Sequence, residues 1–313
     1  LDCLTLITGV SGSGKTTLVK NILYPALQRK FNNYSYKLGD FSSLEGNFNE
    51  LKGVEYIDQN PIGKSSRSNP VTYIKIYDDI RNLFSSLELS KIRNYKPKHF
   101  SFNVDGGRCE NCKGEGSITI EMQFMADVVI ECSECKGSRF KNEICEVQYK
   151  GKSINDILNM TVDDSIVFFQ SNNENKIAQK LKPLNDVGLG YVTLGQPSST
   201  LSGGEAQRIK LASFLSNRNF EKKILFIFDE PTTGLHFHDI NKLVKSFYHL
   251  IEKGHSIIVV EHNLDLIKIA DHIIDLGPGA GEKGGEVVAE GSQEKIINNK
   301  NSFTGKYLIK QLN

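Results

Sequence analysis

Five short motifs with chemically competent side chains follow one another between residues 9 and 262 of this 313-residue chain. They are Gly9–Thr16 (GVSGSGKT), the glutamine of Asp58–Asn60 (DQN), Leu201–Glu205 (LSGGE), Ile224–Glu230 (ILFIFDE) and Val260–His262 (VEH). Their lysine, hydroxyl, carboxylate and imidazole groups are suited to binding a nucleoside triphosphate with Mg²⁺ and to directing water at its terminal phosphate. Any one motif could arise by chance, but the ordered set predicts one nucleotide-hydrolysing site.

The glycine-rich motif lies between an apolar, β-branched run, Leu4–Thr8, and a predicted helix over Lys15–Arg29. Its glycines allow backbone N–H groups to point at a phosphate, and the helix adds the positive end of its dipole. Lys15 would reach the β- and γ-phosphates, and the Thr16 hydroxyl would ligate Mg²⁺. A plain glycine-rich turn is the alternative, which the flanking strand and helix disfavour. The expected nucleotide-binding residues of the loop are Gly9, Ser11, Gly12, Ser13, Gly14, Lys15, Thr16 and Thr17.

Two further apolar runs end in polar residues. Residues 224–228 predict a strand buried on both faces, with Asp229 at its carboxyl end and Glu230 directly after it. We expect Asp229 to hold Mg²⁺ through water, and Glu230 to orient or deprotonate the attacking water. Ser256–Val260 predicts a third buried strand, beyond which His262 could hydrogen-bond the γ-phosphate or that water. Taken alone, the same residues would indicate a solvated strand end and a structural histidine.

The peptide Leu201–Gln207 resembles the signature motif of the ATP-binding-cassette superfamily. The resemblance makes the other four motifs the Walker A, Q-loop, Walker B and H-loop sequences, and it makes Gln59, Glu230 and His262 the expected catalytic residues. In that superfamily the signature contacts the nucleotide of the opposite cassette, so a second cassette is the expected dimer partner.

The signature residues have a physical role consistent with this resemblance. Ser202 and the N–H groups of Gly203 and Gly204 would open a helix toward a γ-phosphate held across an interface. An ordinary helix N-cap is the alternative and the more common use of serine and glycine.

A set of longer peptides resembles the UvrA family of bacterial nucleotide-excision-repair ATPases more narrowly. They are Tyr56–Lys64 with Arg67–Tyr73, Gly106–Cys112, Leu194–Pro197, Asp229–His236, Glu261–Asp265 and Ile274–Pro278. The match runs essentially end to end, but only against that family's carboxyl-terminal cassette. UvrA-like proteins carry two cassettes in one chain, so we expect this chain to be a half-molecule or truncated form, about a third of such a protein, that opens directly on the Walker A strand.

The resemblance implies an ATP-hydrolysing subunit, not itself a nuclease, that recognises DNA damage, binds duplex DNA and loads a UvrB-like partner. The family's UvrB-binding insertion belongs to the other half. A UvrA-like paralogue that serves in antibiotic or self-resistance would show the same motifs and is the alternative. A transporter energy module is disfavoured, since transport cassettes normally have a compact helical subdomain where this chain carries cysteine pairs.

Those pairs, Cys109–Cys112 and Cys132–Cys135, have the CxxC spacing of a four-cysteine zinc site, and each is followed by Lys-Gly, a turn that suits a zinc knuckle. Two disulfides, an iron–sulfur centre and reactive thiols are alternatives, of which persistent disulfides fit a cytosolic protein poorly. Cys3 and Cys145 are expected to be buried small hydrophobes.

The resemblance implies that the zinc module helps to engage DNA. A basic cluster interleaved with aromatic residues precedes it, as on a phosphate-tracking surface. A solvated charged loop ahead of a structural zinc is the alternative. The cluster comprises Lys91, Arg93, Tyr95, Lys96, Lys98, His99, Phe100 and Phe102.

Composition sets the remaining limits. A mean hydropathy of −0.32 and the absence of a long apolar run predict a cytoplasmic protein without a membrane span. The net charge of +1 means that a nucleic-acid surface must come from local patches. We expect an α/β fold, a P-loop ATP-binding-cassette core over residues 1–80 and 220–313. An inserted helical signature domain over 81–219 would contain the zinc module at about 100–140, and ATP, Mg²⁺ and Zn²⁺ are the expected cofactors. Residues 170–176 predict a polar loop inside the insertion, residues 277–285 a turn-rich connection and residues 286–289 an edge strand.

Overall fold

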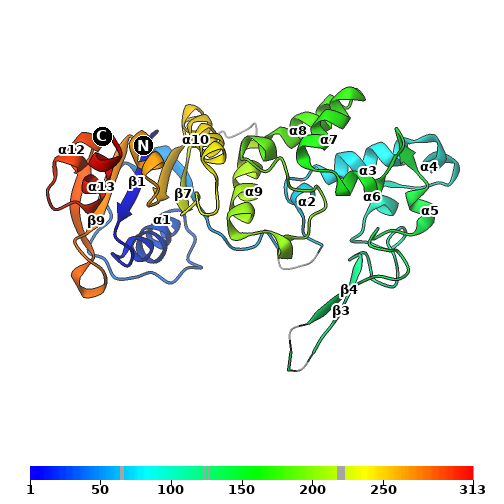
Figure 1. Cartoon of the computed structure of the whole chain (residues 1–313), viewed down its shortest axis with the longest axis horizontal. Helices are drawn as coiled ribbons and strands as arrows, with labels where there is room; N and C mark the ends of the chain where they lie inside the picture. The colour runs from blue at the N-terminus through cyan, green and yellow to red at the C-terminus, as the bar shows by residue number, and fades with distance from the viewer. Residues whose placement is uncertain (64–66, 123, 126, 217–222, 313) are drawn as a thin grey trace. The chain divides into compact units, whose positions relative to one another are not determined.

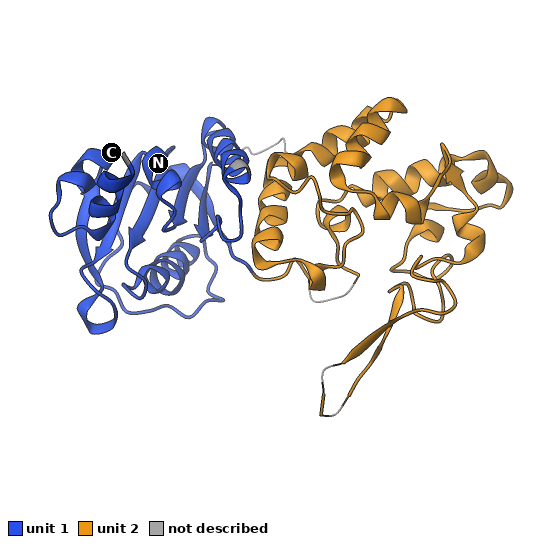
Figure 2. Cartoon of the chain, viewed as in Figure 1, with its two compact units in different colours: residues 1–59, 217–313 blue, residues 60–216 orange. Residues whose placement is uncertain are grey.

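The computed structural model describes residues 1–63, 67–122, 124–125, 127–216 and 223–312 (Figure 1). The chain forms two compact units, Leu1–Gln59 with Asn217–Asn313, and Asn60–Ser216 (Figure 2). The first division follows Gln59, whereas the sequence places it near residue 80. Helix α2 (Pro70–Tyr73) belongs to the inserted unit because it contacts α3 (Tyr77–Ser86) and α9 (Gly203–Ser216). The second expected boundary, near residue 220, and Lys64 lie outside the described residues.

A six-stranded sheet in the order β10-β9-β1-β8-β7-β2 forms the core of the first unit. All neighbours are parallel except β10, which is antiparallel to β9 at the edge. The strands are β1 (Leu4–Gly9), β2 (Leu51–Ile57), β7 (Lys223–Asp229), β8 (Ser256–Val260), β9 (His272–Gly277) and β10 (Glu286–Gly291). The three strands predicted from apolar runs and the edge strand predicted at residues 286–289 are confirmed.

The parallel register brings the carboxyl ends of the central strands to one edge of the sheet. Val260 of β8 lies beside both Ile7 of β1 and Asp229 of β7, and Gly9 of β1 lies beside Leu276 of β9. Because α/β sheets bind ligands at this edge, the register alone assembles the predicted nucleotide site from distant segments.

Helices pack on the sheet of the first unit. The chain is helical from Lys15 to Lys30, first as a π-helical segment, Thr17–Leu23, and then as α1 (Tyr24–Lys30), which confirms the predicted helix. Helix α1 contacts β2, whereas α10 and α13 contact β1. The other elements of the unit are α10 (Phe237–Glu252), α11 (Leu264–Ile269), α12 (Gln293–Asn298), α13 (Phe303–Leu312) and the 3₁₀ turns Phe48–Glu50 and Gly281–Lys283.

The inserted unit is mainly helical. Its helices are α2, α3 (Tyr77–Ser86), α4 (Glu88–Ile92), α5 (Asn142–Cys145), α6 (Ile154–Asn159), α7 (Val162–Ser171), α8 (Asn175–Asp186), α9 (Gly203–Ser216) and the 3₁₀ turns Pro97–Phe100 and Ser198–Thr200. The polar loop expected over 170–176 is only the turn 172–174, because α7 and α8 extend into it. In the described parts of both units, no helix has the length and apolar character needed to traverse a lipid bilayer.

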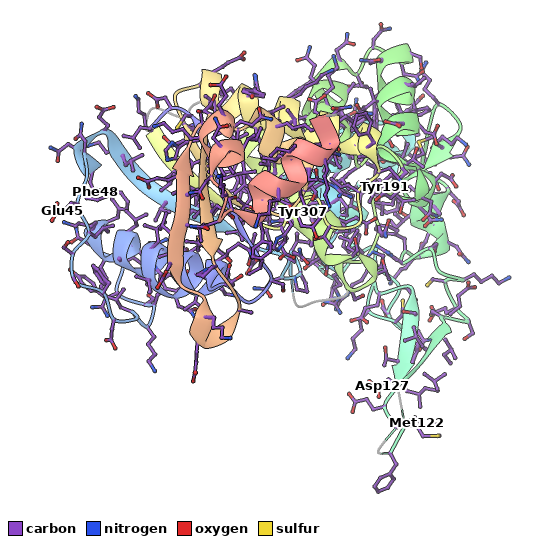
Figure 3. All side chains as sticks on the ribbon, turned by 60° about the vertical axis from the view of Figure 1, so that its left-hand side comes forward. Glu45, Phe48, Met122, Asp127, Tyr191 and Tyr307 are labelled. Atoms are coloured by element: carbon purple, nitrogen blue, oxygen red, sulfur yellow. The ribbon has the colours of Figure 1, made fainter. Side chains whose placement is uncertain are left out.

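Two antiparallel hairpins complete the inserted unit, β3 (Ser117–Ile120) with β4 (Val128–Glu131) and β5 (Gln148–Tyr149) with β6 (Lys152–Ser153). The β3–β4 ribbon is exposed, and Figure 3 shows Met122 and Asp127 near its turn. The Met122 N–H donates to Asp127 Oδ1 at 3.3 Å.

His255, immediately before β8, makes the stability of the first unit sensitive to pH. Its ring is fully buried, Nδ1 accepts the Ile224 N–H at 3.2 Å, and the Phe226 ring meets it edge-on. Burial lowers the pKa of His255, and Lys253 lowers it further, against a smaller opposing effect of Asp2. The neutral ring is therefore the folded form.

We expect this histidine to cost stability at acidic pH. The unfolded state takes up the proton near pH 6.5 and the folded state only below it, so its contribution is complete above about pH 6.5 and is lost as pH falls. Thermal unfolding between pH 7.5 and 5.5 should show a smaller fall in Tm for His255→Asn than for the wild type. The exposed His249→Asn variant should keep the wild-type slope, and equal slopes in all three proteins would contradict the assignment.

Candidate functional site

The glycine-rich loop has the backbone that a phosphate cradle requires. Gly9 has φ 134°, and a Cβ there would lie 2.0 Å from the Leu276 carbonyl oxygen, so only glycine fits beside β9. Gly12 and Gly14 also have positive φ, at 79° and 95°. Ser13 is fully buried, and its Oγ has no hydrogen-bond partner among the described residues. A buried hydroxyl without a protein partner in a glycine-rich loop before a helix fits an anionic ligand.

A later segment of the chain braces this loop, which the sequence did not reveal. The Gly281 N–H donates to Gly12 O at 3.1 Å, and the Gly285 N–H donates to Ser13 O at 3.0 Å. The sequence indicates only a turn-rich connection over 277–285. The hydrogen bonds show that this connection anchors the carbonyl groups of Gly12 and Ser13 and so supports the backbone of the loop.

Lys15 is placed as the cation of the site. Its side chain is almost fully buried, and Nζ donates to the carbonyl oxygens of Gly9 at 3.1 Å and Val10 at 2.9 Å. Burial lowers the pKa of Lys15, while the carboxylates of Glu230, Asp275 and Asp229 oppose part of that effect. Thr16 and Thr17 follow it, exposed at the start of the helix.

Asp229 ends β7 and receives a hydrogen bond that sequence reasoning missed. The Tyr56 hydroxyl of β2 donates to Asp229 Oδ2 at 2.7 Å. Burial raises the pKa of Tyr56, so the hydroxyl stays protonated and remains a donor. A partner of this kind orients a carboxylate that ligates a metal through its other oxygen. Together with Thr16, Asp229 supplies the hard oxygen donors that Mg²⁺ prefers.

Glu230 adopts a strained backbone conformation that its neighbours maintain. Its φ of 47° is left-handed, which is uncommon outside glycine. Its N–H donates to Val260 O at 2.9 Å, while its carbonyl oxygen accepts from Thr233 Oγ1 at 3.0 Å and from Gln59 Nε2 at 3.3 Å. Sequence-predicted Gln59 and Glu230 are therefore in direct contact.

His262 completes the arrangement, because its Nε2 lies 3.4 Å from Glu230 Oε1. Both side chains line a cavity of about 590 Å³ that also borders the glycine-rich loop. Elements after β8 form the rest of its wall, and Figure 3 labels one of these residues, the exposed Tyr307. The lining residues are Thr8, Gly9, Val10, Ser11, Glu230, His262, Leu264, Ile267, Phe303, Thr304 and Tyr307. The apolar part contributed by α11 and α13 was not predicted.

The signature residues begin α9 in the inserted unit and form a helix cap. The Glu205 N–H donates to Ser202 Oγ at 3.2 Å, and the Ser202 N–H donates to Glu205 Oε2 at 2.8 Å. This reciprocal pair is a capping box, so the N-cap alternative describes the local structure. Gly203 and Gly204 form the first turn of α9, and Ser202 is exposed. Contact with a nucleotide across an interface stays a prediction.

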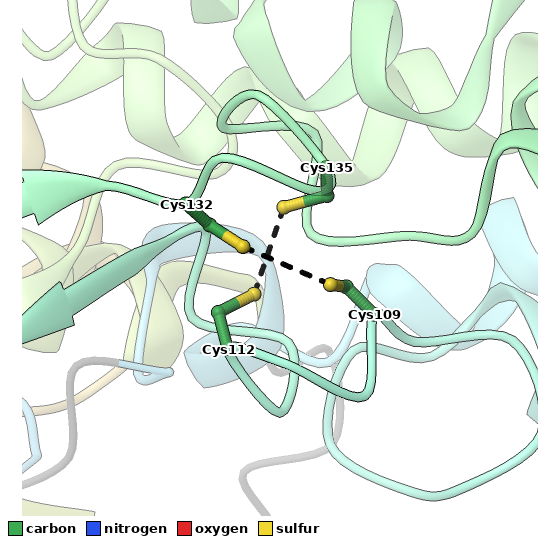
Figure 4. A group of neighbouring side chains, drawn as sticks. All are labelled: Cys109, Cys112, Cys132 and Cys135. Atoms are coloured by element: carbon green, nitrogen blue, oxygen red, sulfur yellow. Dashed lines mark hydrogen bonds between the residues drawn. The ribbon is translucent and has the colours of Figure 1, made fainter.

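The two CxxC pairs meet as predicted (Figure 4). All four cysteines are buried and free, and their sulfur atoms lie within 4.8 Å of one another. The Cys109 and Cys132 sulfurs are 3.9 Å apart, and those of Cys112 and Cys135 are 3.6 Å apart. Four thiolates on one tetrahedral Zn²⁺ with bonds of about 2.3 Å would be about 3.8 Å apart. The site therefore fits one zinc ion, and these cysteines do not form the two alternative disulfides.

The turns after each pair explain the knuckle geometry. Lys113 and Lys136 have φ of 51° and 46°, and the glycines that follow, Gly114 and Gly137, have φ of 87° and 76°. The same left-handed pair thus closes both knuckles. The other two cysteines, Cys3 and Cys145, are only half-buried, so the expectation that they are buried is wrong: Cys3 lies near the chain start and Cys145 at the end of the short helix α5.

The basic cluster before the zinc module is less suited to stacking on bases than the sequence indicates. Phe100 and Phe102 are fully buried and pack on Phe84 and Tyr77, so the prediction that they are part of a DNA-binding surface is wrong. The 3₁₀ turn Pro97–Phe100 directs its aromatic end into the core. Arg93 pairs with Glu146 at 2.6 Å, while Lys91, Lys96 and Lys98 are exposed. The β3–β4 ribbon adds no positive charge, because residues 114–135 contain neither lysine nor arginine.

We expect zinc loading to depend on the four clustered cysteines alone. Cys112→Ser should lose its stoichiometric zinc, measured by elemental analysis of the purified chain, and should unfold at lower temperature. Cys145→Ser, a half-buried cysteine in the same unit, should keep about one zinc per chain. Full zinc retention by Cys112→Ser, or its loss from Cys145→Ser, would contradict the site.

The loop after β1, the acidic pair after β7, the glutamine beyond β2 and the histidine beyond β8 define the nucleotide-binding core of an ATP-binding cassette. No protein-family model matches the chain. Along its length it resembles UvrABC system protein A of Clostridium perfringens, with 55% identity over 312 residues, all of this chain and 33% of that protein. The Staphylococcus epidermidis protein of that name is 53% identical over 308 residues, 98% of this chain and 32% of that protein.

A solved structure shows similarity to the same group of proteins. The crystal structure of UvrA2 from Deinococcus radiodurans superposes on this chain with a TM-score of 0.89 and 42% sequence identity. The superposition covers all of this chain and 37% of the UvrA2 chain. The chain therefore matches a segment of UvrA-family proteins, and it spans about a third of the length of the curated relatives.

Proposed function

We propose that the chain is the ATP-hydrolysing, carboxyl-terminal cassette of a UvrA-type subunit that recognises damaged DNA in nucleotide excision repair. One observation carries the enzymatic part: Gln59 and His262 both contact Glu230, at the strand ends that also present the glycine-rich loop. The end-to-end similarity to UvrABC system protein A supports the repair role.

The residues divide the chemistry between them. The N–H groups of the loop and Lys15 bind the phosphates, and Thr16 and Asp229 hold Mg²⁺, which neutralises developing charge on the phosphate oxygens. Glu230 orients and deprotonates the attacking water, and His262 donates a hydrogen bond to the γ-phosphate or that water. Because Glu230 is only partly exposed and faces the cavity beside the loop, its carboxylate is on the same side as the phosphates.

A second cassette is needed to complete the site. Ser202, Gly203 and Gly204 begin α9 with an exposed N-cap, which is suited to capping a γ-phosphate held by the opposite cassette. Gln59 is the last residue of the first unit, and its amide bonds the Glu230 carbonyl. Loss of the γ-phosphate can therefore be relayed along the backbone from Glu230 to the start of the inserted unit.

The inserted unit engages DNA in this proposal. Damaged DNA has no fixed base sequence, so recognition relies on backbone contacts and deformability. The exposed Lys91, Lys96 and Lys98 are the basic residues of the cluster that remain available for phosphates. A UvrB-like protein is the proposed partner, through the part of the family's sequence that this chain does not span, and the location is cytoplasmic.

The alternative of a resistance paralogue is not favoured. The relatives at 53–55% identity are named UvrABC system protein A. Stimulation of ATP hydrolysis by DNA separates the two, since a resistance ATPase has no need of it.

Glu230→Gln tests the catalytic assignment. The amide keeps the size of the side chain but cannot accept a proton from water, so kcat should fall at least about 100-fold while ATP affinity stays within about threefold. Steady-state hydrolysis and binding of a fluorescent ATP analogue should be measured over a range of protein concentrations, since the opposite cassette is supplied by association. Unchanged hydrolysis in the variant would refute the role of Glu230.

DNA engagement is tested by fluorescence anisotropy of a labelled duplex, with and without one bulky adduct, at two salt concentrations and with a slowly hydrolysed ATP analogue. We expect salt-sensitive binding that favours the adduct or responds to nucleotide. Lys91→Gln/Lys96→Gln/Lys98→Gln should weaken binding and flatten its salt dependence. Lys176→Gln, an exposed lysine already paired with Asp79 in the same unit, is the control. No binding at either salt would remove DNA recognition from this segment.

A further inference from the structure

Glu261, between the last residue of β8 and His262, has no role in the chemistry described above, yet its carboxylate is nearly fully buried. We infer that Glu261 is the positioning residue that holds Glu230 and His262 in register with one another. The inference rests on the proposed hydrolysis and adds a determinant of its geometry.

Each carboxylate oxygen of Glu261 holds a different catalytic loop. Oε1 accepts from the N–H of Thr232 at 2.9 Å and also from the Thr232 hydroxyl. Oε2 accepts from the N–H of His262 at 2.7 Å and from the N–H of Asn263 at 3.0 Å. One side chain therefore links the segment just after Glu230 to the segment that carries His262.

These hydrogen bonds use the full capacity of a carboxylate. An ionised carboxylate has about four acceptor sites, and four donors occupy them here. Among the described residues, Glu261 has no basic partner in an ion pair. Its buried charge is thus stabilised by the N–H and O–H groups of the two loops, which makes the loop positions and the charge interdependent.

The backbone beside Glu261 extends the same support. The Val260 carbonyl accepts the N–H of Glu230, and the Glu261 N–H donates to Ile7 O of β1 at 3.1 Å. Two consecutive residues at the end of β8 therefore fix the backbone around Glu230. Val260 accepts the N–H of Glu230, and Glu261 accepts the N–H and hydroxyl of Thr232, two residues further along the chain. A left-handed glutamate persists only where its surroundings enforce it, and this pair of contacts does so.

Asn263 shows what a purely structural residue does in the same loop. Its Oδ1 accepts from the N–H groups of Asp265 at 2.9 Å and Leu266 at 3.4 Å, and so caps α11. Asn263→Ala removes this cap while leaving the backbone N–H that Glu261 binds. Asn263→Ala is therefore a matched control that lowers stability without changing the positions of Glu230 and His262 relative to one another.

The decisive variant is Glu261→Gln. The amide retains one acceptor oxygen and places an NH₂ group against N–H donors, so one loop must move away. We expect kcat to fall about tenfold or more with KM changed less than about threefold, because displacement of reacting groups by about 1 Å has effects of this order. Asn263→Ala should lower the Tm through loss of the α11 cap, with kcat within about twofold of wild type.

Epistasis separates positioning from general stability. In a His262→Ala background, Glu261→Gln should reduce kcat by a clearly smaller factor than in the wild type, because one of the two groups that it aligns is already missing. Its effect on Tm should be the same in both backgrounds. Equal kcat factors in the two backgrounds would overturn the inference.

Amide hydrogen exchange provides a readout that does not need activity. Glu261→Gln should speed exchange in both segments, 232–233 and 262–263, whereas Asn263→Ala should affect only the start of α11. If wild type hydrolyses ATP no faster than Glu230→Gln, the proposed function fails, and the exchange experiment still decides whether Glu261 joins the loops. If wild type hydrolyses ATP but Glu261→Gln matches Asn263→Ala in kcat, the inference fails and the proposed function stands.

Discussion

Hydrogen bonding between parallel strands β1, β7 and β8 is the constraint on which the candidate site depends. Each strand delivers one functional group at its carboxyl end: the glycine-rich loop follows β1, the acidic pair follows β7 and the histidine follows β8. The side chains of a strand alternate between the two faces of the sheet, so a slip of one residue in any pairing would turn these groups away from one another. The apolar strand sequences buried on both faces oppose such a slip, because they would lose packing on either side.

At the ends of these strands, one residue of the site has a strained backbone that its neighbours stabilise. Glu230 is held in a left-handed conformation by backbone hydrogen bonds, while its side chain remains open to the cavity. Two neighbouring polar groups are engaged within the protein: the buried Glu261 carboxylate accepts four hydrogen bonds, and the half-buried Tyr56 hydroxyl donates to Asp229. Rigidity therefore resides in the second layer of contacts, and the reacting groups themselves stay accessible to water and ligand.

The sequence predicted the elements whose signal is local. Walker-type spacing, apolar strands and paired CxxC motifs each depend on neighbouring residues, and the predicted strands and cysteine cluster were found. Contacts that depend on tertiary register had no local signal: Tyr56 reaches Asp229 from another strand, and the loop 279–285 reaches back to the glycine-rich loop. The error at Phe100 and Phe102 arose because alternation of basic and aromatic residues looks the same whether the rings face solvent or the core.

The position of β1 between β8 and β9 also sets an order for folding. β1 precedes the inserted unit in the sequence, but both of its hydrogen-bonded neighbours, β8 and β9, follow that unit. Until they emerge, the glycine-rich loop has no sheet to support it, whereas the inserted unit already has its own core and can close by itself. The nascent chain can therefore complete the inserted unit, with its four-cysteine cluster, before the sheet around the glycine-rich loop can form, and premature termination in the last strands would release a folded insertion attached to an unfinished core.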